Sequence, residues 1–355
     1  MKNKKFFSEN LIKWDGSENN RKMPWKGEKD PYRIWISEIV LQQTRVSQGL
    51  EYYERFIRAF PDIGALATAP EKEVFKLWEG LGYYSRCRNL IATAVYLHEE
   101  MHGKFPEKFE DILKLKGIGN YTASAIASFA FNQPYAVLDG NVFRVLSRFF
   151  GIDTPVDSTE GKKQFAVLAQ ELIDPKAPAL YNQAIMDFGA LICKPAQPLC
   201  SQCPLQTRCQ GLSAGMVEDL PVKSRRVKQT RRYFNYLLLQ KGPALYVHQR
   251  TGRDIWEHLH EPLLIETDHP LSAEELLQSS AFKSLWTNRR YHLREISGLY
   301  TQKLTHQLIS ARFFHIELDR VPPFLEGYEP LAPRDLAGLA FPKIIASYLK
   351  EKKYL

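Results

Sequence analysis

The hydrophobic pattern of the chain changes at one short basic segment, and this change limits the folds that the sequence can adopt. From Pro31 to Pro204, apolar residues recur at intervals of three and four, with glycine or proline between the stretches. This pattern predicts successive helices, the first over residues 31–48. After residue 232, short runs of aromatic and β-branched residues alternate with turn signals, as in β-strands. We therefore expect an all-α domain followed by an α+β or mixed α/β domain.

The segment between the two patterns, residues 223–232, carries six basic and no acidic side chains. Because the net charge of the whole chain is +8, most of the excess lies in this segment and the two flanking parts are nearly neutral. Affinity for a polyanion must then come from local features rather than from a general positive field. The predicted organisation is a first domain over 1–222, a basic connector over 223–232 and a second domain over 233–355.

The start of the chain and the lengths of its apolar segments predict the cellular compartment. The basic residues at the N-terminus precede no apolar stretch, and no later segment offers the roughly 18 uninterrupted apolar residues of a membrane-spanning helix. We expect a cytoplasmic protein with no membrane partner. These features leave the oligomeric state open, and a monomer is the default expectation.

Four of the five cysteines are crowded into residues 193–209, in the spacing C-x6-C-x2-C-x5-C. Such a cluster predicts a metal site rather than a secreted disulfide framework. The two C-x2-C pairs of structural zinc sites are missing, and an iron–sulfur cluster fits four cysteines better. The predicted ligands are therefore Cys193, Cys200, Cys203 and Cys209, whereas Cys87 is expected to be a helical packing residue.

Two carboxylates stand out because of their surroundings. Glu38 lies in a stretch that is apolar on nearly every side, where burial would raise its pKa toward that of a general acid. The alternative is a structural glutamate paired with a basic side chain. Asp139 precedes a helical pattern, so it could be a helix N-cap, a role that Asn141 could fill equally. Near a positively charged sugar, the same carboxylate would stabilise the charge, and glycosidic cleavage usually employs two carboxylates.

Two loops carry signals of nucleic-acid binding. Gly117 and Gly119 flank an isoleucine between two helical patterns, where glycine lets the backbone approach a phosphate at the next helix. An ordinary helix C-cap explains these glycines equally well. Residues 81–86, Leu-Gly-Tyr-Tyr-Ser-Arg, combine aromatic rings that could wedge between bases with an arginine for phosphate, although such aromatics also complete a core.

Taken in order over about residues 5–210, the sequence resembles the MutY-type adenine DNA glycosylases. The resemblance implies a helix-hairpin-helix glycosylase domain with a 4Fe-4S cluster. It also implies base excision repair of double-stranded DNA, in which adenine opposite 8-oxoguanine or guanine is flipped out and hydrolytically removed. The segments that carry the resemblance are Met23-Pro24-Trp25, WISEIVLQQT, WEGLGYYSRCRNL, the Gly-Ile-Gly turn, LDGNVFRVLSR and the cysteine spacing.

The resemblance also implies roles for single residues. Glu38 would protonate the adenine, Asp139 would stabilise the oxocarbenium-like sugar, and Asn141 would help to orient them. Tyr121 occupies the position where bifunctional endonuclease III-type enzymes carry a Schiff-base lysine, so a monofunctional enzyme is expected. Gln183 is a candidate for the adenine pocket. The residues that match positions around the orphaned 8-oxoguanine are Gln43, Thr44, Leu81 and Tyr83.

The second domain resembles the Nudix-like domain by which this family reads 8-oxoguanine. It lacks the glutamate-rich box of Nudix hydrolases, so hydrolysis of nucleoside triphosphates is not expected. Leu304-Thr305-His306 resembles the family's Phe-Ser-His recognition loop, and a plain polar hairpin turn is the alternative.

Two other functions compete with adenine removal. One is a bifunctional or thymine-mismatch glycosylase of the endonuclease III superfamily, against which Tyr121 and the second domain argue. The other is a noncatalytic iron–sulfur DNA-binding protein, which would need no acid at Glu38.

Overall fold

The computed structural model describes residues 2–44, 46–224, 229–287 and 289–355. Its contacts divide the chain into two compact units. The first unit comprises Met1–Thr68 and Asn89–Arg226, and the second comprises Ala69–Arg88 and Val227–Leu355. The helical segment at residues 69–88 thus belongs to the unit that contains the strands.

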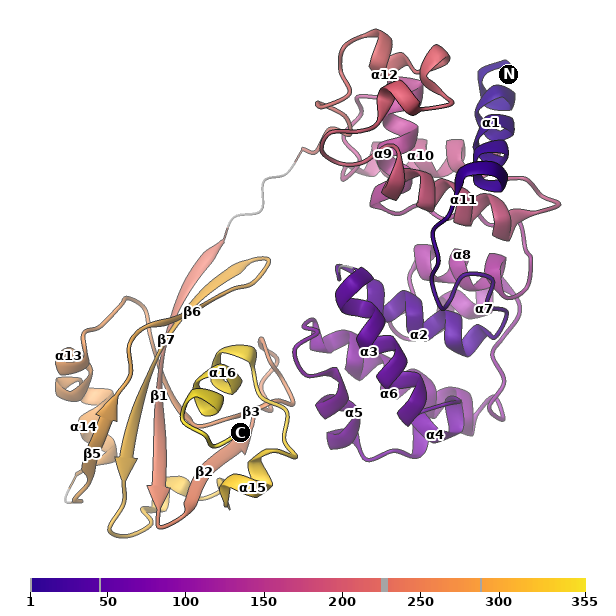
Figure 1. The fold of residues 1–355 in the computed structure, drawn as a ribbon. Helices are drawn as coiled ribbons and strands as arrows, with labels where there is room; N and C mark the ends of the chain where they lie inside the picture. The colour runs from indigo at the N-terminus through magenta and orange to yellow at the C-terminus, as the bar shows by residue number, and fades with distance from the viewer. Residues whose placement is uncertain (1, 45, 225–228, 288) are drawn as a thin grey trace. The chain divides into compact units, whose positions relative to one another are not determined.

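The described residues of the first unit form helices and their connecting loops, which confirms the predicted all-α region (Figure 1). Helix α6 (Tyr84–Glu99) spans the boundary between the units. No helix in the described part of the chain is long and apolar enough to cross a membrane. The remaining helices of this unit are α1 (Lys2–Glu18), α2 (Pro31–Leu41), α3 (Val46–Ala59), α4 (Ile63–Thr68), α7 (Phe109–Lys114), α8 (Asn120–Phe129), α9 (Gly140–Phe150), α10 (Thr159–Leu172), α11 (Pro178–Leu191), α12 (Gln210–Ser213), and the 3-10 helices η1 (Cys200–Gln202) and η2 (Gln206–Arg208).

The predicted helix over residues 31–48 is wrong in its length. Helix α2 begins at Pro31, behind an Asp30 side chain that accepts a hydrogen bond from the Tyr32 amide, and it ends at Leu41. Gln43 then has φ +57°. This left-handed backbone cannot continue a right-handed helix, and a second helix, α3, begins at Val46.

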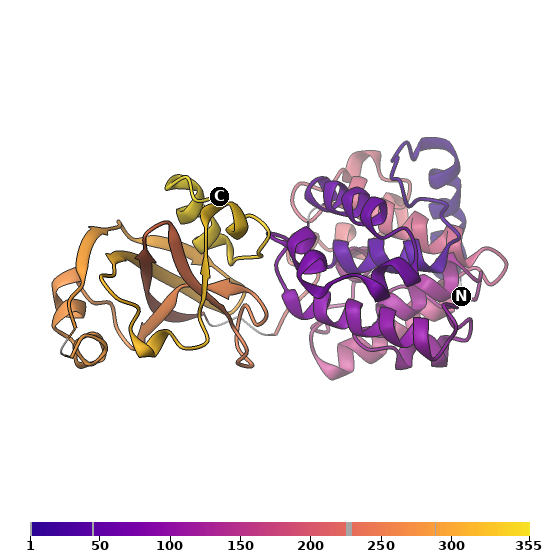
Figure 2. The ribbon, with the colours of Figure 1, turned by 90° about the horizontal axis from the view of Figure 1, so that it is seen from below.

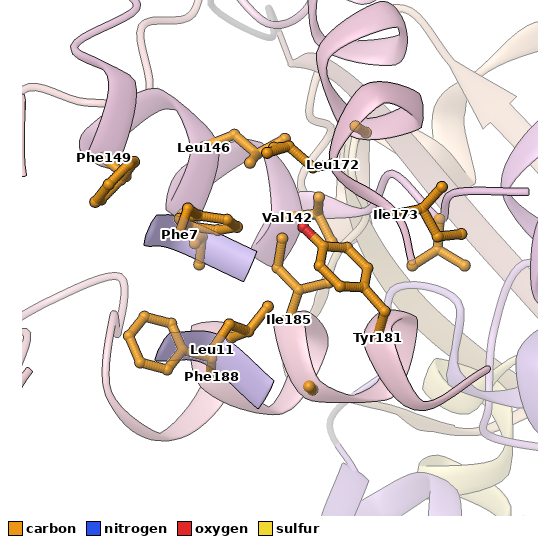
Figure 3. Close-up of a cluster of buried hydrophobic side chains, with 14 of the residues drawn as sticks. Phe7, Leu11, Val142, Leu146, Phe149, Leu172, Ile173, Tyr181, Ile185 and Phe188 are labelled. Atoms are coloured by element: carbon orange, nitrogen blue, oxygen red, sulfur yellow. The ribbon is translucent and has the colours of Figure 1, made fainter. Parts of the chain in front are cut away.

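Helix α1, which the apolar pattern did not predict, contributes to the core of the first unit. Figure 3 shows its side chains between those of α9 and α11. Packing of these helices fixes the start of α9 beside α11, and this is where the candidate site lies. The labelled core residues are Phe7, Leu11, Val142, Leu146, Phe149, Leu172, Ile173, Tyr181, Ile185 and Phe188.

The second unit is built on an eight-stranded mixed sheet, which confirms the predicted strand-rich part of the chain. The long strands β1 (Thr230–Lys241) and β7 (Gln307–Glu317) run parallel at its centre, with Thr230 opposite Gln307. Strand β1 begins within the predicted connector, of which residues 225–228 lie outside the described residues. The other strands are β2 (Ala244–Gln249), β3 (His260–Glu261), β4 (Leu263–Thr267), β5 (His292–Ile296), β6 (Tyr300–Lys303) and β8 (Glu329–Leu331).

Helices cover both faces of this sheet because successive strand residues point to opposite sides. On one face, Phe313 of β7 stacks on Tyr348 of α16 (Lys343–Glu351), with ring centroids 4.0 Å apart. On the other face, Phe314 packs in a cluster with α13 (Ala273–Gln278) and α14 (Ser280–Leu285). Figure 2 shows these helices on opposite sides of the sheet. The unit is completed by α5 (Glu71–Trp78), α15 (Pro333–Leu336) and the 3-10 helix η3 (Pro323–Leu325).

Candidate active site

A cavity of about 550 Å³ opens among α2, α8, α9, α11 and the segment that joins α1 to α2. Six residues singled out from the sequence lie in its wall, although they come from four separate helices and two loops. These residues are Glu38, Thr44, Tyr121, Asp139, Asn141 and Gln183.

Glu38 projects from the middle of α2 and is only 6% exposed. Its pKa is raised to about 7, chiefly by burial and to a smaller extent by the nearby charge of Asp139, although a hydrogen bond from Tyr121 opposes the rise. The Tyr121 hydroxyl donates this bond to Glu38 Oε2 at 2.7 Å. Among the described residues, none of the groups that set this pKa is a basic side chain. A protonated Glu38 at neutral pH suits a general acid better than an ion-paired structural glutamate.

Asp139 is the N-cap of α9 and also lies in the wall of the cavity. Its Oδ1 accepts a hydrogen bond from the Val142 amide at 2.8 Å, and its Oδ2 accepts one from Asn141 Nδ2 at 2.7 Å. Burial raises the pKa of Asp139, and the hydrogen bonds from Val142 and Asn141 oppose that rise. The two interpretations of Asp139, as helix cap and as charge in the site, are therefore compatible.

Asn141 is held in turn by Arg144, a buried cation on the same helix. One Arg144 N–H donates to Asn141 Oδ1 at 2.9 Å, and others donate to the carbonyl oxygens of Gly189 and Cys193 at 2.7 Å. Gly189 allows this approach, because a Cβ there would lie 2.7 Å from the Cβ of Asn141. The geometry links the start of the cysteine loop to the amide that orients Asp139.

The four cysteines of residues 193–209 surround one small cavity of about 30 Å³, and all four are free thiols. Arg148 and the apolar side chains of Ile192, Leu199 and Leu212 are also in its lining. No group of three or more histidine, cysteine or acidic side chains within the described ranges is arranged to hold a metal ion. Cys87, as predicted, is a buried helical residue outside this loop.

The Gly-Ile-Gly turn connects α7 to α8. Gly117 has φ +81°, and a Cβ on it would lie 2.6 Å from the Asn89 Cβ, so both its backbone and its neighbour require glycine. Gly119 is the N-cap of α8 and supplies no side-chain cap to the first N–H groups of that helix. Backbone N–H groups at such a helix start are suited to bind an anion.

A second cavity, of about 450 Å³, lies in the second unit. Tyr83 lines it with a 42% exposed ring and φ +50°, and its hydroxyl makes a short hydrogen bond with the Thr305 hydroxyl. Thr305 and His306 form the exposed turn between β6 and β7. The Arg86 guanidinium lies over the Tyr83 ring, 5.2 Å from its centroid, in a cation–π contact. Leu81, in contrast, is buried and absent from this lining.

The structure thus separates most of the predicted site residues into four places: the first cavity, the cysteine cavity, the Gly-Ile-Gly turn and the second cavity. Gln43 belongs to neither the first nor the second cavity and is exposed. Sequence reasoning overlooked two residues that support the first site, Arg144 and Asp187, and it assigned no role to the loop residues around Arg21. The signal that could have found the first two is the one that singled out Glu38, a charge within an apolar helical stretch.

Comparison with known proteins places this geometry among DNA repair enzymes. Residues 36–174 match the family model described as HhH-GPD superfamily base excision DNA repair protein. The chain is 36% identical over 260 residues to an adenine DNA glycosylase of Buchnera aphidicola subsp. Baizongia pistaciae, covering 71% of this chain and 72% of that protein. It is 42% identical to the Homo sapiens adenine DNA glycosylase, over 58% of this chain and 39% of that protein.

Solved structures agree on the fold of the helical part. A structure described as a thermostable thymine-DNA glycosylase matches with a TM-score of 0.56 and 28% identity, covering 60% of this chain and 98% of its own. A trapped endonuclease III–DNA covalent intermediate matches with a TM-score of 0.52 and 20% identity, over 60% of this chain and 96% of its own.

Proposed function

Because this chain belongs to the family of adenine DNA glycosylases, we propose that its substrate is duplex DNA in which adenine is mispaired with 8-oxoguanine or guanine. The observation that carries the site assignment is the contact between Tyr121 and Glu38, beside Asp139 in one cavity. A base in a duplex is inaccessible, so the adenine must leave the stack to enter this cavity.

In the proposed reaction, the bond between the sugar C1′ and adenine N9 breaks, and its electron pair goes to the base. Glu38 gives its proton to a ring nitrogen of the purine, which makes adenine a better leaving group. The ionised Asp139, held by Asn141, stabilises the positive charge on the sugar. Water then adds to C1′, and its proton returns to the Glu38 carboxylate.

We propose that the enzyme is monofunctional. A lyase needs an unprotonated amine that attacks C1′, and Tyr121 contributes only a hydroxyl next to Glu38. Three lysines, Lys26, Lys29 and Lys176, do lie in the cavity wall. The Lys26 amine is ion-paired with Asp187 at 3.1 Å, and the Lys29 amine donates to the Phe129 carbonyl oxygen at 2.9 Å, so both amines are bound to other groups of the protein.

A panel of duplexes tests this function. The chain should release adenine opposite 8-oxoguanine and opposite guanine. It should not release adenine opposite thymine or thymine opposite guanine. The strand should remain intact until hot alkali cleaves the abasic site. Release of thymine would support the thymine-mismatch alternative, and binding without any base release would support the noncatalytic one.

The rate of adenine release should depend on pH because the acid must be protonated and its partner ionised. The pKa of Glu38 is about 7, so the single-turnover rate should be highest below that pH and should fall about tenfold per pH unit above it. At lower pH the rate should fall again as Asp139, whose pKa is also raised, becomes protonated. The measurement uses enzyme in excess of labelled duplex. A rate that rises with pH through 7 would contradict the role of Glu38.

We propose that Cys193, Cys200, Cys203 and Cys209 hold a 4Fe-4S cluster, because all four free thiols line one cavity. Such a cluster would fix the loop whose Cys193 carbonyl oxygen holds Arg144. Purified protein should be yellow-brown, with about four iron and four sulfide per chain. Cys200→Ser should lower the iron content, whereas the matched Cys87→Ser should retain it. Stoichiometric zinc without visible absorbance would contradict the cluster.

We propose that the second unit is a Nudix-like domain that reads the base opposite adenine. Tyr83, Thr305 and the exposed His306 line a cavity large enough for a purine edge, and the Tyr83 and Thr305 hydroxyls are hydrogen-bonded to each other. Replacing Thr305 and His306 together by alanine should reduce the preference for 8-oxoguanine over guanine by about 1–3 kcal/mol, the usual value of base-edge hydrogen bonds. The comparison is of single-turnover rates on the two duplexes. The exposed Thr287→Ala is the control, and unchanged preference in the double variant would make the turn structural.

A further inference from the structure

A buried carboxylate on α11, Asp187, gathers three donors from the segment between α1 and α2. Its side chain is fully buried. Asp187 Oδ1 accepts from Arg21 Nη1 at 2.7 Å, and Oδ2 accepts from Asn19 Nδ2 at 2.9 Å and from Lys26 Nζ at 3.1 Å. Burial by itself would raise the pKa of Asp187, but these three bonds lower it. The carboxylate is therefore ionised, and its charge depends on donors from a single segment.

That segment, residues 19–29, is a wall of the cavity that contains Glu38 and Asp139; we name it the strap. It has no helix or strand of its own. Its backbone–backbone bonds form two turns, from the Lys26 amide to the Met23 carbonyl oxygen at 3.0 Å and from the Glu28 amide to the Trp25 carbonyl oxygen at 3.2 Å. Such local bonds shape only the turns, so the position of the strap against α11 depends on contacts outside it. The strap residues in the cavity wall are Arg21, Met23, Trp25, Lys26, Gly27, Glu28 and Lys29.

Further contacts hold the strap besides its bonds to Asp187. The Trp25 ring meets the Tyr53 ring edge to face at 5.3 Å, and Lys29 Nζ donates to the Phe129 carbonyl oxygen at 2.9 Å. At its two ends, Asn19 Nδ2 donates to Asp15 Oδ1 of α1 at 2.5 Å, and Glu28 forms an ion pair with Arg33 of α2 at 3.8 Å. The ion pair of Glu28 is longer than that of Arg21 with Asp187, at 2.7 Å. Asp187 also shares α11 with Gln183 and Met186, which lie in the same cavity wall. The carboxylate thus ties two parts of the wall to each other.

We infer that Asp187 is a positioning residue, which holds the strap in the shape that receives the extruded base without itself reacting. This inference rests on the proposed function. Because phosphate contacts supply most of the affinity for DNA, loss of the Asp187 charge should slow base release and leave duplex binding nearly intact. Misplacement of a binding wall by a fraction of a bond length is enough to slow a reaction strongly.

The test compares Asp187→Asn with wild type in two measurements. The single-turnover rate on an adenine:8-oxoguanine duplex should fall by roughly a hundredfold, with the dissociation constant within about threefold. In the folded chain, limited trypsin digestion followed by mass spectrometry should show faster cleavage after Arg21, Lys22 and Lys26. Glu171→Gln is the matched control, because Glu171 pairs with Lys4 of the same N-terminal region at an exposed site. It should change neither measurement.

A second variant keeps the inference falsifiable if Asp187→Asn does not fold. Lys26→Gln removes one of the partners, a side chain that is 29% exposed, and should slow base release and hasten cleavage after Arg21 and Lys22. Where both single variants fold, the double variant should be no slower than the slower of them, since both act on one contact. Wild-type rates, or unchanged cleavage of the strap, would overturn the inference. If wild-type protein released no adenine, the proposed function would fail, while the cleavage pattern would still test whether Asp187 holds the strap.

Discussion

Replacement of Glu38 by glutamine is expected to slow adenine release by about 10²–10⁴-fold, the usual contribution of a general acid. Glutamine has nearly the same shape, and its amide oxygen can still accept the bond that the Tyr121 hydroxyl donates at 2.7 Å. It cannot deliver a proton to the leaving base. The pocket and the helix α2 should therefore persist while the chemistry is lost.

The measurement is single-turnover release of adenine opposite 8-oxoguanine, with duplex affinity measured on the same preparation. Affinity should stay within a few-fold of wild type, since Glu38 is buried in the cavity wall and is not a phosphate ligand. The exposed Glu160→Gln, at the first turn of α10, is the control for loss of a carboxylate. A Glu38→Gln protein that releases adenine at the wild-type rate would remove Glu38 from the mechanism.

Replacement of Asp139 by asparagine is expected to slow the reaction at least about 10²-fold, because a neutral amide cannot offset the positive charge of the sugar. The substitution separates the two roles of this residue. Asparagine caps a helix as well as aspartate does, so the bond from the Val142 amide at 2.8 Å and the start of α9 should be retained.

Asp30→Asn supplies the matched comparison. Asp30 caps α2 through the Tyr32 amide at 2.9 Å and lies outside the cavity wall. Both variants should melt near the wild-type temperature, and only Asp139→Asn should lose activity. Equal activity of the two variants would make Asp139 a helix cap and nothing more.

The sequence alone determined those features that depend on local pattern. The change of hydrophobic period predicted helices before the connector and a sheet after it, because each period matches the geometry of one backbone conformation. Glu38 was recognisable as a candidate because a carboxylate in a stretch that is apolar on nearly every side is expected to be buried, and burial by itself raises the pKa of a carboxyl group. The group of four cysteines was also recognisable, because all four lie within residues 193–209 and no residue far away in the sequence is needed to complete the group.

Only the tertiary structure decided which distant side chains meet. Nothing in the local pattern indicates that Asp187 faces Asn19, Arg21 and Lys26, more than 160 positions away. The same holds for Tyr83, which meets Thr305 across 222 positions, and for the grouping of residues 69–88 with the sheet. Local pattern shows that a charge or hydroxyl is present. The partner of that charge or hydroxyl is decided by packing, because a side-chain hydrogen bond forms only where donor and acceptor lie within about 3 Å of each other. In one unit the packing of α1, α9 and α11 decides it, and in the other unit the position of the β6–β7 turn decides it.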